Sequence, residues 1–333
     1  MELKLLYNTK DYHKLVECVA RVCYQSQNKI NKESHKMIKS IMKKGHLSIA
    51  SVGNIVWGIN HEYDETVSIY HDLVTLKQIN NHVRWTTKDA KKNPGSNYDI
   101  VLSMNILSLL DIANSIDTYE VSEDEQNLFK HIMNSIKDVP EIKWFLDDLV
   151  KLPERENPYH ASPNLLNPVM LSEDYTKLQT HLTKYNLEVH STITVDFISD
   201  RASGLQLWRH GDQTGGCELS QRYVSRNNSD YRMPVDMVNE HELDLHNRFM
   251  SDHIQHYEDA FQIYKEYGYR TGRAKELARN YLPNIETRII QCRPLKQWKH
   301  LFNLRDSVHA QKEVAEDVRA IKNEFTRKGI EIK

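Results

Sequence analysis

The clearest periodicity in the chain runs along Leu187-Glu188-Val189-His190-Ser191-Thr192-Ile193-Thr194-Val195-Asp196-Phe197. Side chains in a strand point alternately to opposite faces of the sheet. Here Leu187, Val189, Ile193, Val195 and Phe197 point one way and polar residues fill most of the positions between them. The alternation predicts a half-buried strand, with one face on the core and the other toward solvent.

Directly after this strand comes the densest group of polar and glycine residues in the chain. Ser199 or Asp200 is placed to cap a short helix that ends near Trp208. The chain then continues as Arg209-His210-Gly211-Asp212-Gln213-Thr214-Gly215-Gly216-Cys217-Glu218-Leu219-Ser220-Gln221-Arg222-Tyr223. We interpret this segment as the centre of the functional site.

The first half of the segment has two readings. Gln206 and Arg209 are three residues apart and share a helix face, with His210 next to them. The planar fork of an arginine suits a phosphate or a pair of carbonyl groups. Arginine and histidine also occur at helix ends simply because they complement the helix dipole.

The second half favours an anionic ligand. Backbone N–H groups in a turn around Gly215-Gly216 are able to cradle an anion, and Ser220 and Arg222 add a hydroxyl and a guanidinium. A plain polar loop is the alternative. The sequence contains neither GxGxxG nor GxxxxGK[ST], which excludes the two common nucleotide-binding loops.

A second group of basic residues lies in the C-terminal third of the chain. Lys296 and His300 are four residues apart, and Arg279 and Arg288 flank a Leu-Pro break. These residues are either a solvated basic stripe or part of a site. Arg305 follows an apolar run and is expected at the edge of the core, where a cation would stabilise developing negative charge.

Composition narrows the class of protein. Among 333 residues there are 44 basic and 46 acidic side chains, so no general basic field favours nucleic acid. No apolar run approaches the ~18 residues that span a bilayer, and the N-terminus lacks a signal-peptide core. The four cysteines have no CxxC spacing, which indicates a reducing compartment, and we expect a cytoplasmic protein without a metal site. A thiolate at Cys217 would be stabilised by nearby cations, although an inert thiol is favoured.

The other elements are read from their periodicity. Strands are expected at 2–6, 55–59 and 287–292, and helices at 11–23, 32–44, 238–267, 273–281, 295–302 and 314–325. Residues 60–185 have a different character, being polar and mostly helical, with helices expected at 100–116, 128–136 and 142–152. We interpret 60–185 as an insertion.

These blocks, in this order, resemble the flavin-dependent thymidylate synthases, the ThyX family. The family motif Arg-His-Arg, spacer, Ser-x-Arg-Tyr is similar to Arg209-His210-Gly211 with Ser220-Gln221-Arg222-Tyr223. Further similar blocks are Ala20–Tyr24, Gly45–Ser48, Ala278-Arg279 with Leu282-Pro283, His300 with Leu304-Arg305, and His309–Gln311 with Glu313. The resemblance covers about residues 1–60 and 186–325. It implies an α+β fold, a small and mostly antiparallel sheet flanked by helices, in a single catalytic domain 1–333 that carries the largely helical insertion 60–185.

The resemblance also implies a reaction: reductive methylation of dUMP to dTMP, with methylenetetrahydrofolate as carbon donor and NADPH-reduced FAD as hydride source. It implies a homotetramer with shared active sites. Arg305 would polarise the uracil ring as the catalytic residue. The implied dUMP contacts are Gln206, Arg209, Glu218, Leu219, Ser220, Gln221, Arg222, Arg279 and Arg305. The implied FAD contacts are Ser48, Arg209, His210, Glu218, Lys296 and His300.

Four positions depart from the family pattern on the flavin side. Gly211 and Lys296 replace arginines, Ser51 replaces a glutamate and Pro294 replaces an asparagine; the spacer is also one residue longer. Within the insertion, Ser103-Met104-Asn105 is similar to an Asn-centred motif of longer relatives, with Leu107 in place of an arginine. Two alternatives therefore stay open: a dUMP hydroxymethylase or other pyrimidine-nucleotide modification on the same scaffold, and a nucleotide-binding protein that has lost turnover.

Overall fold

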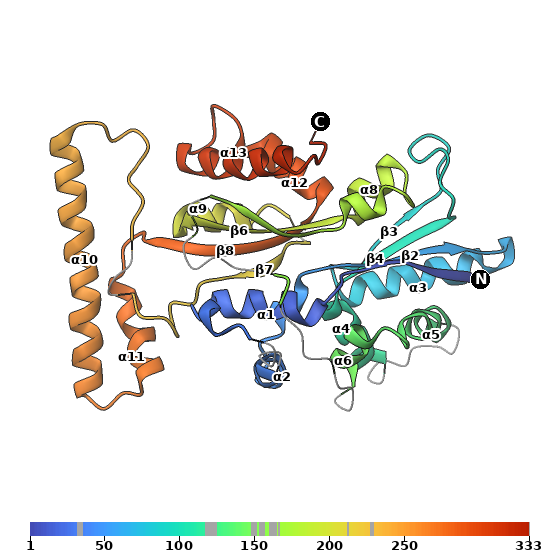
Figure 1. The fold of residues 1–333 in the computed structure, drawn as a ribbon, viewed down its shortest axis with the longest axis horizontal. Helices are drawn as coiled ribbons and strands as arrows, with labels where there is room; N and C mark the ends of the chain where they lie inside the picture. The colour runs from blue at the N-terminus through green and yellow to red at the C-terminus, as the bar shows by residue number, and fades with distance from the viewer. Residues whose placement is uncertain are drawn as a thin grey trace.

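The computed structural model describes residues 1–31, 36–116, 125–147, 152, 157–159, 165, 167–211, 213–226 and 230–332. Within these residues the chain forms two four-stranded antiparallel sheets surrounded by helices, which confirms the α+β class (Figure 1). Sheet 1, in the order β1-β2-β4-β3, consists of β1 (Glu2–Asn8), β2 (Ile55–Asn60), β3 (Arg84–Thr87) and β4 (Ile100–Met104). Sheet 2, in the order β5-β6-β8-β7, consists of β5 (Val169–Glu173), β6 (Thr192–Asp200), β7 (Gly215–Glu218) and β8 (Glu286–Pro294).

The helices follow the same division along the chain. Those in the part that contains sheet 1 are α1 (Tyr12–Cys23), α2 (Lys36–Lys43), α3 (Thr66–Ile79), α4 (Ile106–Ile116), α5 (Glu125–Ile136) and α6 (Pro140–Leu146), with short 3-10 turns η1 (Gln27–Lys29), η2 (Leu47–Ser51) and η3 (Tyr63–Glu65). Those in the part that contains sheet 2 are α7 (Tyr175–Leu178), α8 (Lys184–His190), α9 (Arg201–Trp208), α10 (Glu240–Glu266), α11 (Thr271–Ala278), α12 (Leu295–Arg305) and α13 (Lys312–Arg327), with η4 (Arg279–Tyr281).

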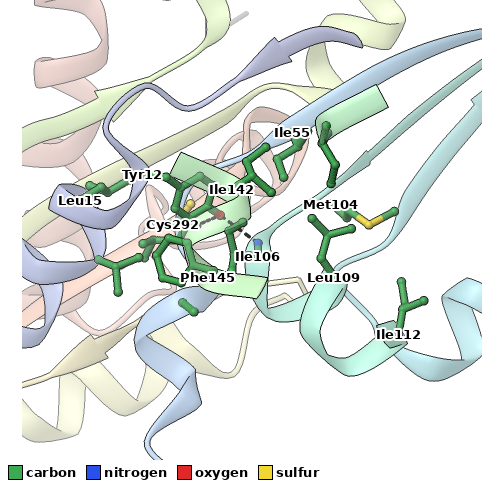
Figure 2. Close-up of a cluster of buried hydrophobic side chains, with 14 of the residues drawn as sticks. Tyr12, Leu15, Ile55, Met104, Ile106, Leu109, Ile112, Ile142, Phe145 and Cys292 are labelled. Atoms are coloured by element: carbon green, nitrogen blue, oxygen red, sulfur yellow. Dashed lines mark hydrogen bonds between the residues drawn. The ribbon is translucent and has the colours of Figure 1, made fainter. Parts of the chain in front are cut away.

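The core of sheet 1 is closed by Tyr12 of α1, whose ring lies among aliphatic side chains of α4 and α6 (Figure 2). Its hydroxyl donates to the Val52 carbonyl and accepts from the Ile106 backbone N–H at 3.1 Å. The ring thus fixes the start of α4 directly after β4. The helix expected from Asp11 is α1, although Asp11 has a left-handed φ of 49° and makes no side-chain cap.

The core of sheet 2 lies beneath α12 and α13, which cover one face of the sheet (Figure 1). Trp298 and Phe302 of α12 meet Phe325 of α13 with ring centroids 5.5 and 5.3 Å apart. The C-terminal helix predicted from its apolar stripe is confirmed, and its four stripe residues, Val314, Val318, Ile321 and Phe325, are fully buried.

The strand predicted at 187–197 is wrong in two respects. Leu187 and His190 belong to helix α8, which Thr183 caps by accepting from the Asn186 N–H, and the strand begins at Thr192. Leu187 and His190 are three residues apart and share the buried face of the helix, whereas a strand would place them on opposite faces. The strand is also not half-buried, because its polar face is covered as well: Thr194 and Asp196 have no exposed surface.

Asp196 is tolerated there because Arg288 of β8 pairs with it, its Nε lying 2.8 Å from Oδ1. Burial raises the pKa of Asp196, while the bond to Arg288 opposes that rise. A carboxylate buried in this way needs such a partner.

The segment 60–185 is largely helical where it is described, as expected, but it also contains strands. Residues 100–104 are strand β4 and not the first turn of a helix, so the helix predicted over 100–116 begins only at Ile106. All five β4 residues are buried, and a short continuous apolar run of this kind is shared by buried strands and helices. β3 and β4 complete sheet 1. Residues 32–35, 117–124 and 148–151, which the predicted helices touch or adjoin, lie outside the described residues.

Helices α10 and α11 form an arm at one end of the molecule, beyond sheet 2 (Figure 1). Asn239 caps α10 by accepting from the His241 N–H, and Gly268 follows its end with a φ of 83°, so the long helix expected over 238–267 is confirmed. In the part of the chain that the structure describes, no helix has the length and apolarity needed to cross a membrane.

The two sheets are joined by a buried polar network. The Asn54 side chain donates to Asp174 at 2.7 Å and accepts from Arg84 at 2.6 Å. Nearby, the two ring nitrogens of His190 contact Thr86 and Ser103, each at 2.8 Å. Burial raises the pKa of Asp174 to about 7 and lowers that of His190 well below its ordinary value. Arg84, whose pKa burial lowers to about 10, is the cation of the network and favours the ionised form of Asp174.

Asp174 gives a pH prediction. With a pKa of about 7 in the fold and about 3.9 unfolded, the folded state alone binds this proton between those values. Its contribution to stability is therefore present at low pH and lost as pH rises through about 7. In Asp174→Asn that contribution is absent, so the wild-type free energy of unfolding minus that of the variant should increase as pH falls from 8 to 5, by up to about 1.4 kcal/mol per pH unit.

Urea unfolding followed by circular dichroism at pH 8, 7, 6 and 5 measures this difference. His190, which acts in the opposite direction, is common to both proteins and cancels. Parallel stability curves for wild type and variant would contradict the prediction.

Candidate nucleotide and cofactor site

The predicted site residues gather at opposite ends of sheet 2. Gly215 of β7 is opposite Cys292 and Glu218 is opposite Ile289. Helix α9 begins after Asp200 and runs back along the sheet, so that Arg293, near the end of β8, reaches the carbonyls of Leu207 and His210. The segment that begins at Arg209 therefore lies at the end of sheet 2 where β8 finishes. The residues that follow β7 lie at the opposite end of the sheet. We call the first set the α9–α12 group: Gln206, Arg209, His210, Lys296, His300 and Arg305. We call the second set the β7 group: Glu218, Leu219, Ser220, Gln221, Arg222 and Arg279.

The α9–α12 group is a cluster of cations around one neutral imidazole. Arg305 Nε lies 3.0 Å from His210 Nε2, which accepts its hydrogen bond. Burial, followed by the charges of Arg305, Arg209, Arg293 and His300, lowers the pKa of His210. The pKa of Arg305 is also lowered, by burial and by Arg209. Mutual repulsion of this kind is relieved by an anion.

Gln206 lies beside the same cluster. Its side-chain amide donates to Gln311 Oε1, which connects α9 to the start of α13. The structure thus brings His210 together with Arg305, which lies far from it in sequence, and joins Gln206 to Gln311.

Arg293 is a positioning residue that sequence reasoning missed. It is fully buried, and burial lowers its pKa to about 9. Its guanidinium donates to the Leu207 and His210 carbonyls and to Gln291 Oε1, at 3.0 Å for the last, and lies 5.3 Å from the centre of the Trp298 ring. No local pattern sets Arg293 apart, because the same strand also carries Arg288 and Gln291. Arginine is almost never fully buried without partners, so a surface position was the expectation.

The β7 group lies beside the N-terminal signatures. The Ser220 N–H donates to the Cys23 carbonyl at 3.0 Å. The Tyr223 ring is 5.2 Å from that of Tyr24 and 6.4 Å from that of His46. Ser48 follows His46 by two residues, and its carbonyl accepts from Ser51, which itself accepts from the Gly216 N–H of β7.

Glu218 and Arg222 already have protein partners. Glu218 Oε1 accepts from Arg201 and from Thr287, both at 3.1 Å. Arg222 lies 3.6 Å from Glu276 of α11, whose pKa also responds to Arg279. Arg222 and Arg279 are exposed, so the β7 group presents its cations outward beside α11.

The predicted anion cradle at Gly215-Gly216 is wrong. Both glycines lie in strand β7 and are buried, and the Gly216 N–H donates to Ser51 Oγ at 3.0 Å. A Cβ on Gly215 would collide with the Ser51 carbonyl, and one on Gly216, whose φ is 122°, with the Ile290 carbonyl. The glycines are required for close packing of β7 on η2 and β8.

Cys217 is buried between these glycines and α1, and its thiol contacts the Val19 carbonyl at 3.2 Å. Burial raises the pKa of this thiol well above its ordinary value. The inert-thiol reading is therefore the one that the geometry supports.

A cavity of about 510 Å³ opens beside the α9–α12 group. Lys296, His300, Pro294 and Gly211 line one side; Lys77, Arg84 and Trp85, from α3 and β3, line the other. Its volume is within the range of about 300–1,000 Å³ that holds small molecules and cofactors. The cationic side chains and the partly exposed indole suit an anionic ligand with a flat ring, and the residues thus fit FAD. Sequence reasoning missed Lys77, Arg84 and Trp85, because no motif marks them.

The departure at Gly211 has a structural cause. Its φ is 130°, and a Cβ there would lie 2.5 Å from Gln297 Oε1 and 3.1 Å from Arg293 Nη1. The backbone in this loop is therefore one that glycine adopts and that the arginine of the family pattern would strain.

These features define an α+β protein whose cations gather at the two ends of one antiparallel sheet and along an adjoining cavity. Residues 177–328 match the family model described as thymidylate synthase complementing protein. The match covers a little under half of the chain and supports a member of the ThyX family of thymidylate synthases. No curated protein matches the chain. The matched range contains both residue groups but not Ser48, Lys77 or Trp85.

The packing role of the glycine pair gives a second prediction. Gly216→Ala should lower the free energy of unfolding by about 2–4 kcal/mol, because it combines a strained φ with a backbone collision. Gly272→Ala is the matched control: it lies in helix α11 with open space around it, and alanine there should be neutral or stabilising by up to about 1 kcal/mol. Urea unfolding curves compare the two variants; equal stability would show that Gly216 is not a packing residue.

Proposed function

We propose that the protein is an enzyme that reductively methylates dUMP to dTMP, with methylenetetrahydrofolate as carbon donor and FAD, reduced by NADPH, as hydride source. The family match over residues 177–328 supports a thymidylate synthase. The single observation that best supports this reaction is the α9–α12 group. In it, Arg305 donates to a neutral His210 within a cationic cluster.

Arg305 is the proposed catalytic residue. It sits at the end of α12, after the buried Leu301 and Phe302, so its guanidinium is held at the edge of the core. A guanidinium aimed at the uracil carbonyls would stabilise the negative charge that develops when the ring is activated. His210 and Gln206 orient this end of the site, and Arg209 supplies a cation for the phosphate.

The β7 group completes the nucleotide site from another chain. Because the two groups occupy opposite ends of sheet 2 and the β7 cations face outward beside α11, we infer that Glu218, Ser220, Arg222 and Arg279 serve a neighbouring chain's site. This arrangement supports the homotetramer with shared active sites that the resemblance implies.

FAD would be held in the cavity by Lys296, His300 and the adjoining Arg209 and His210. When bound it supplies hydride chemistry, which side chains lack. The protein supplies orientation, positive charge and a wall that limits access of water. Ser48 and Glu218, also expected at the flavin, lie beside the β7 group, and would reach it from a neighbouring chain.

The primary test is direct. Purified protein should show a flavin absorbance spectrum, and with methylenetetrahydrofolate and NADPH it should release tritium from dUMP labelled at carbon 5. Mass analysis of the product separates dTMP from a hydroxymethyl nucleotide. A protein that stays colourless after addition of FAD, or that binds dUMP without any product, contradicts the proposal.

Arg305→Ala provides the third prediction. Removing a preorganised charge from the transition state should lower kcat by roughly 10²–10³-fold. Arg327→Ala is the control, because Arg327 is an exposed residue of α13 whose guanidinium pairs with Glu324 of the same helix. Its activity should stay within about twofold of wild type. Equal kcat values for Arg305→Ala and the control would remove Arg305 from the mechanism.

A further inference from the structure

We propose that the chain is an internal duplication: residues 1–146 and 169–327 are two copies of one folding unit, and a single ligand cavity is built between them. The strand orders are the same, since β1-β2-β4-β3 in sheet 1 corresponds to β5-β6-β8-β7 in sheet 2, and every neighbouring pair is antiparallel. Along the chain, each sheet's last strand is followed at once by a helix.

The register agrees residue by residue. In sheet 1, Leu5 pairs with Trp57 and Tyr7 with Val56, so that Leu6 is bulged out. In sheet 2, Met170 pairs with Val195 and Ser172 with Thr194, so that Leu171 is bulged out. A bulge is a specific backbone feature that families keep, and its recurrence at the same place is not required by a four-stranded sheet.

The other pairs keep the same correspondence. In the β2–β4 pair Ile55 is opposite Met104, and at the equivalent place in the β6–β8 pair Ile193 is opposite Arg293. In the β3–β4 pair Arg84 is opposite Ser103, and in the β7–β8 pair Gly215 is opposite Cys292. The following helices then bury equivalent positions. The fully buried residues are Ile106, Leu109 and Ile112 of α4, and Leu295, Trp298 and Leu301 of α12.

The two copies meet as the subunits of a two-fold dimer do, with each contact made twice. Turn η2 of the first copy packs on β7 of the second through Ser51 and Gly216. Helix α8 of the second copy packs on β3 of the first, where Thr86 donates to Asn186 at 2.8 Å. Val101 enters the core of sheet 2, and its counterpart Ile290 enters the core of sheet 1.

Among the residues that the structure describes, a cavity of this size opens on one of the two equivalent sides. The cavity is lined by Pro294, Lys296 and His300, whose counterparts are Asn105, Leu107 and Asp111. A lysine and a histidine are thus replaced by an apolar and an acidic residue.

The counterpart side is also closed by hydrogen bonds. The Asn105 amide donates to the Ser51 carbonyl at 2.9 Å, Ser108 donates to Asn105, and Asn80 donates to Asp111 at 2.6 Å. An anionic ligand therefore has one site per chain and not two.

The open site is incomplete without the first copy. Trp85 of β3 presents a partly exposed indole, held edge-on by Tyr70 at 5.6 Å, and Lys77 lies at the end of α3. Together with Lys296 across the cavity, they suit a ligand with a flat aromatic ring and an anionic group. Under the proposed function, on which this identification rests, that ligand is FAD.

Titration of the full-length apoprotein with FAD, followed by quenching of flavin fluorescence, tests the inference. Lys77→Ala and Trp85→Leu should each raise the Kd for FAD at least tenfold, whereas Trp85→Phe, which keeps a ring, should stay within about threefold. Lys296→Ala is the positive control from the second copy. Asp111→Asn, on the closed side, should leave the Kd within twofold, and the wild type should bind one FAD per chain. Thermal unfolding midpoints identify any variant that has not folded, including Lys77→Ala, which removes a half-buried side chain that donates to the Asn81 carbonyl.

The outcomes are separable. A wild type that binds no FAD overturns both this inference and the proposed function. Wild-type binding with unchanged affinity in Lys77→Ala and in folded Trp85→Leu overturns only the role of the first copy. Two FAD per chain, or weakening in Asp111→Asn equal to that in Lys296→Ala, overturns the single open site.

Discussion

The rest of the structure depends on the buried join between the two sheets. Asn54 contacts Asp174 across it, and Arg84 and His190 complete a network in which each polar group has a hydrogen-bond partner. Unpaired polar groups are costly in such surroundings, so the network permits only one relative position of the sheets. That position sets β3 opposite the start of α12. The cavity walls, with Trp85 on one side and Lys296 on the other, follow from it.

Local signals in the sequence predicted the elements that carry their own start and stop residues. Asp200 caps α9, Asn239 and Gly268 bound α10, and the apolar stripe of α13 is buried as expected. Short apolar runs were misread. Leu187 and Val189 continue the alternation of the strand although they belong to α8, and the continuous run from Ile100 to Met104 is shared by buried strands and helices. The family motifs located both cationic groups.

The sequence could not indicate that those groups lie at opposite ends of one sheet, nor that Lys77 and Trp85 face Lys296. Such contacts are made between segments far apart in the chain, and no local pattern encodes them. Gly215 and Gly216 show a different limit. A glycine pair beside charged residues suggests an anion loop, yet the pair is explained by backbone packing against Ser51 and Ile290.

The arm of α10 and α11 has a consequence for how the chain folds. In sheet 1 the connection between β3 and β4 is the short loop 88–99, whereas in sheet 2 the connection between β7 and β8 spans 219–285 and includes the arm. Closing a longer loop costs more chain entropy, and pairings distant in sequence form later. The β3–β4 hairpin should therefore form early. The pairing of β7 with β8 should form later, because the arm lies between these two strands in the sequence. Since sheet 1 also leaves the ribosome first, it would serve as the surface on which the last strands of sheet 2 assemble.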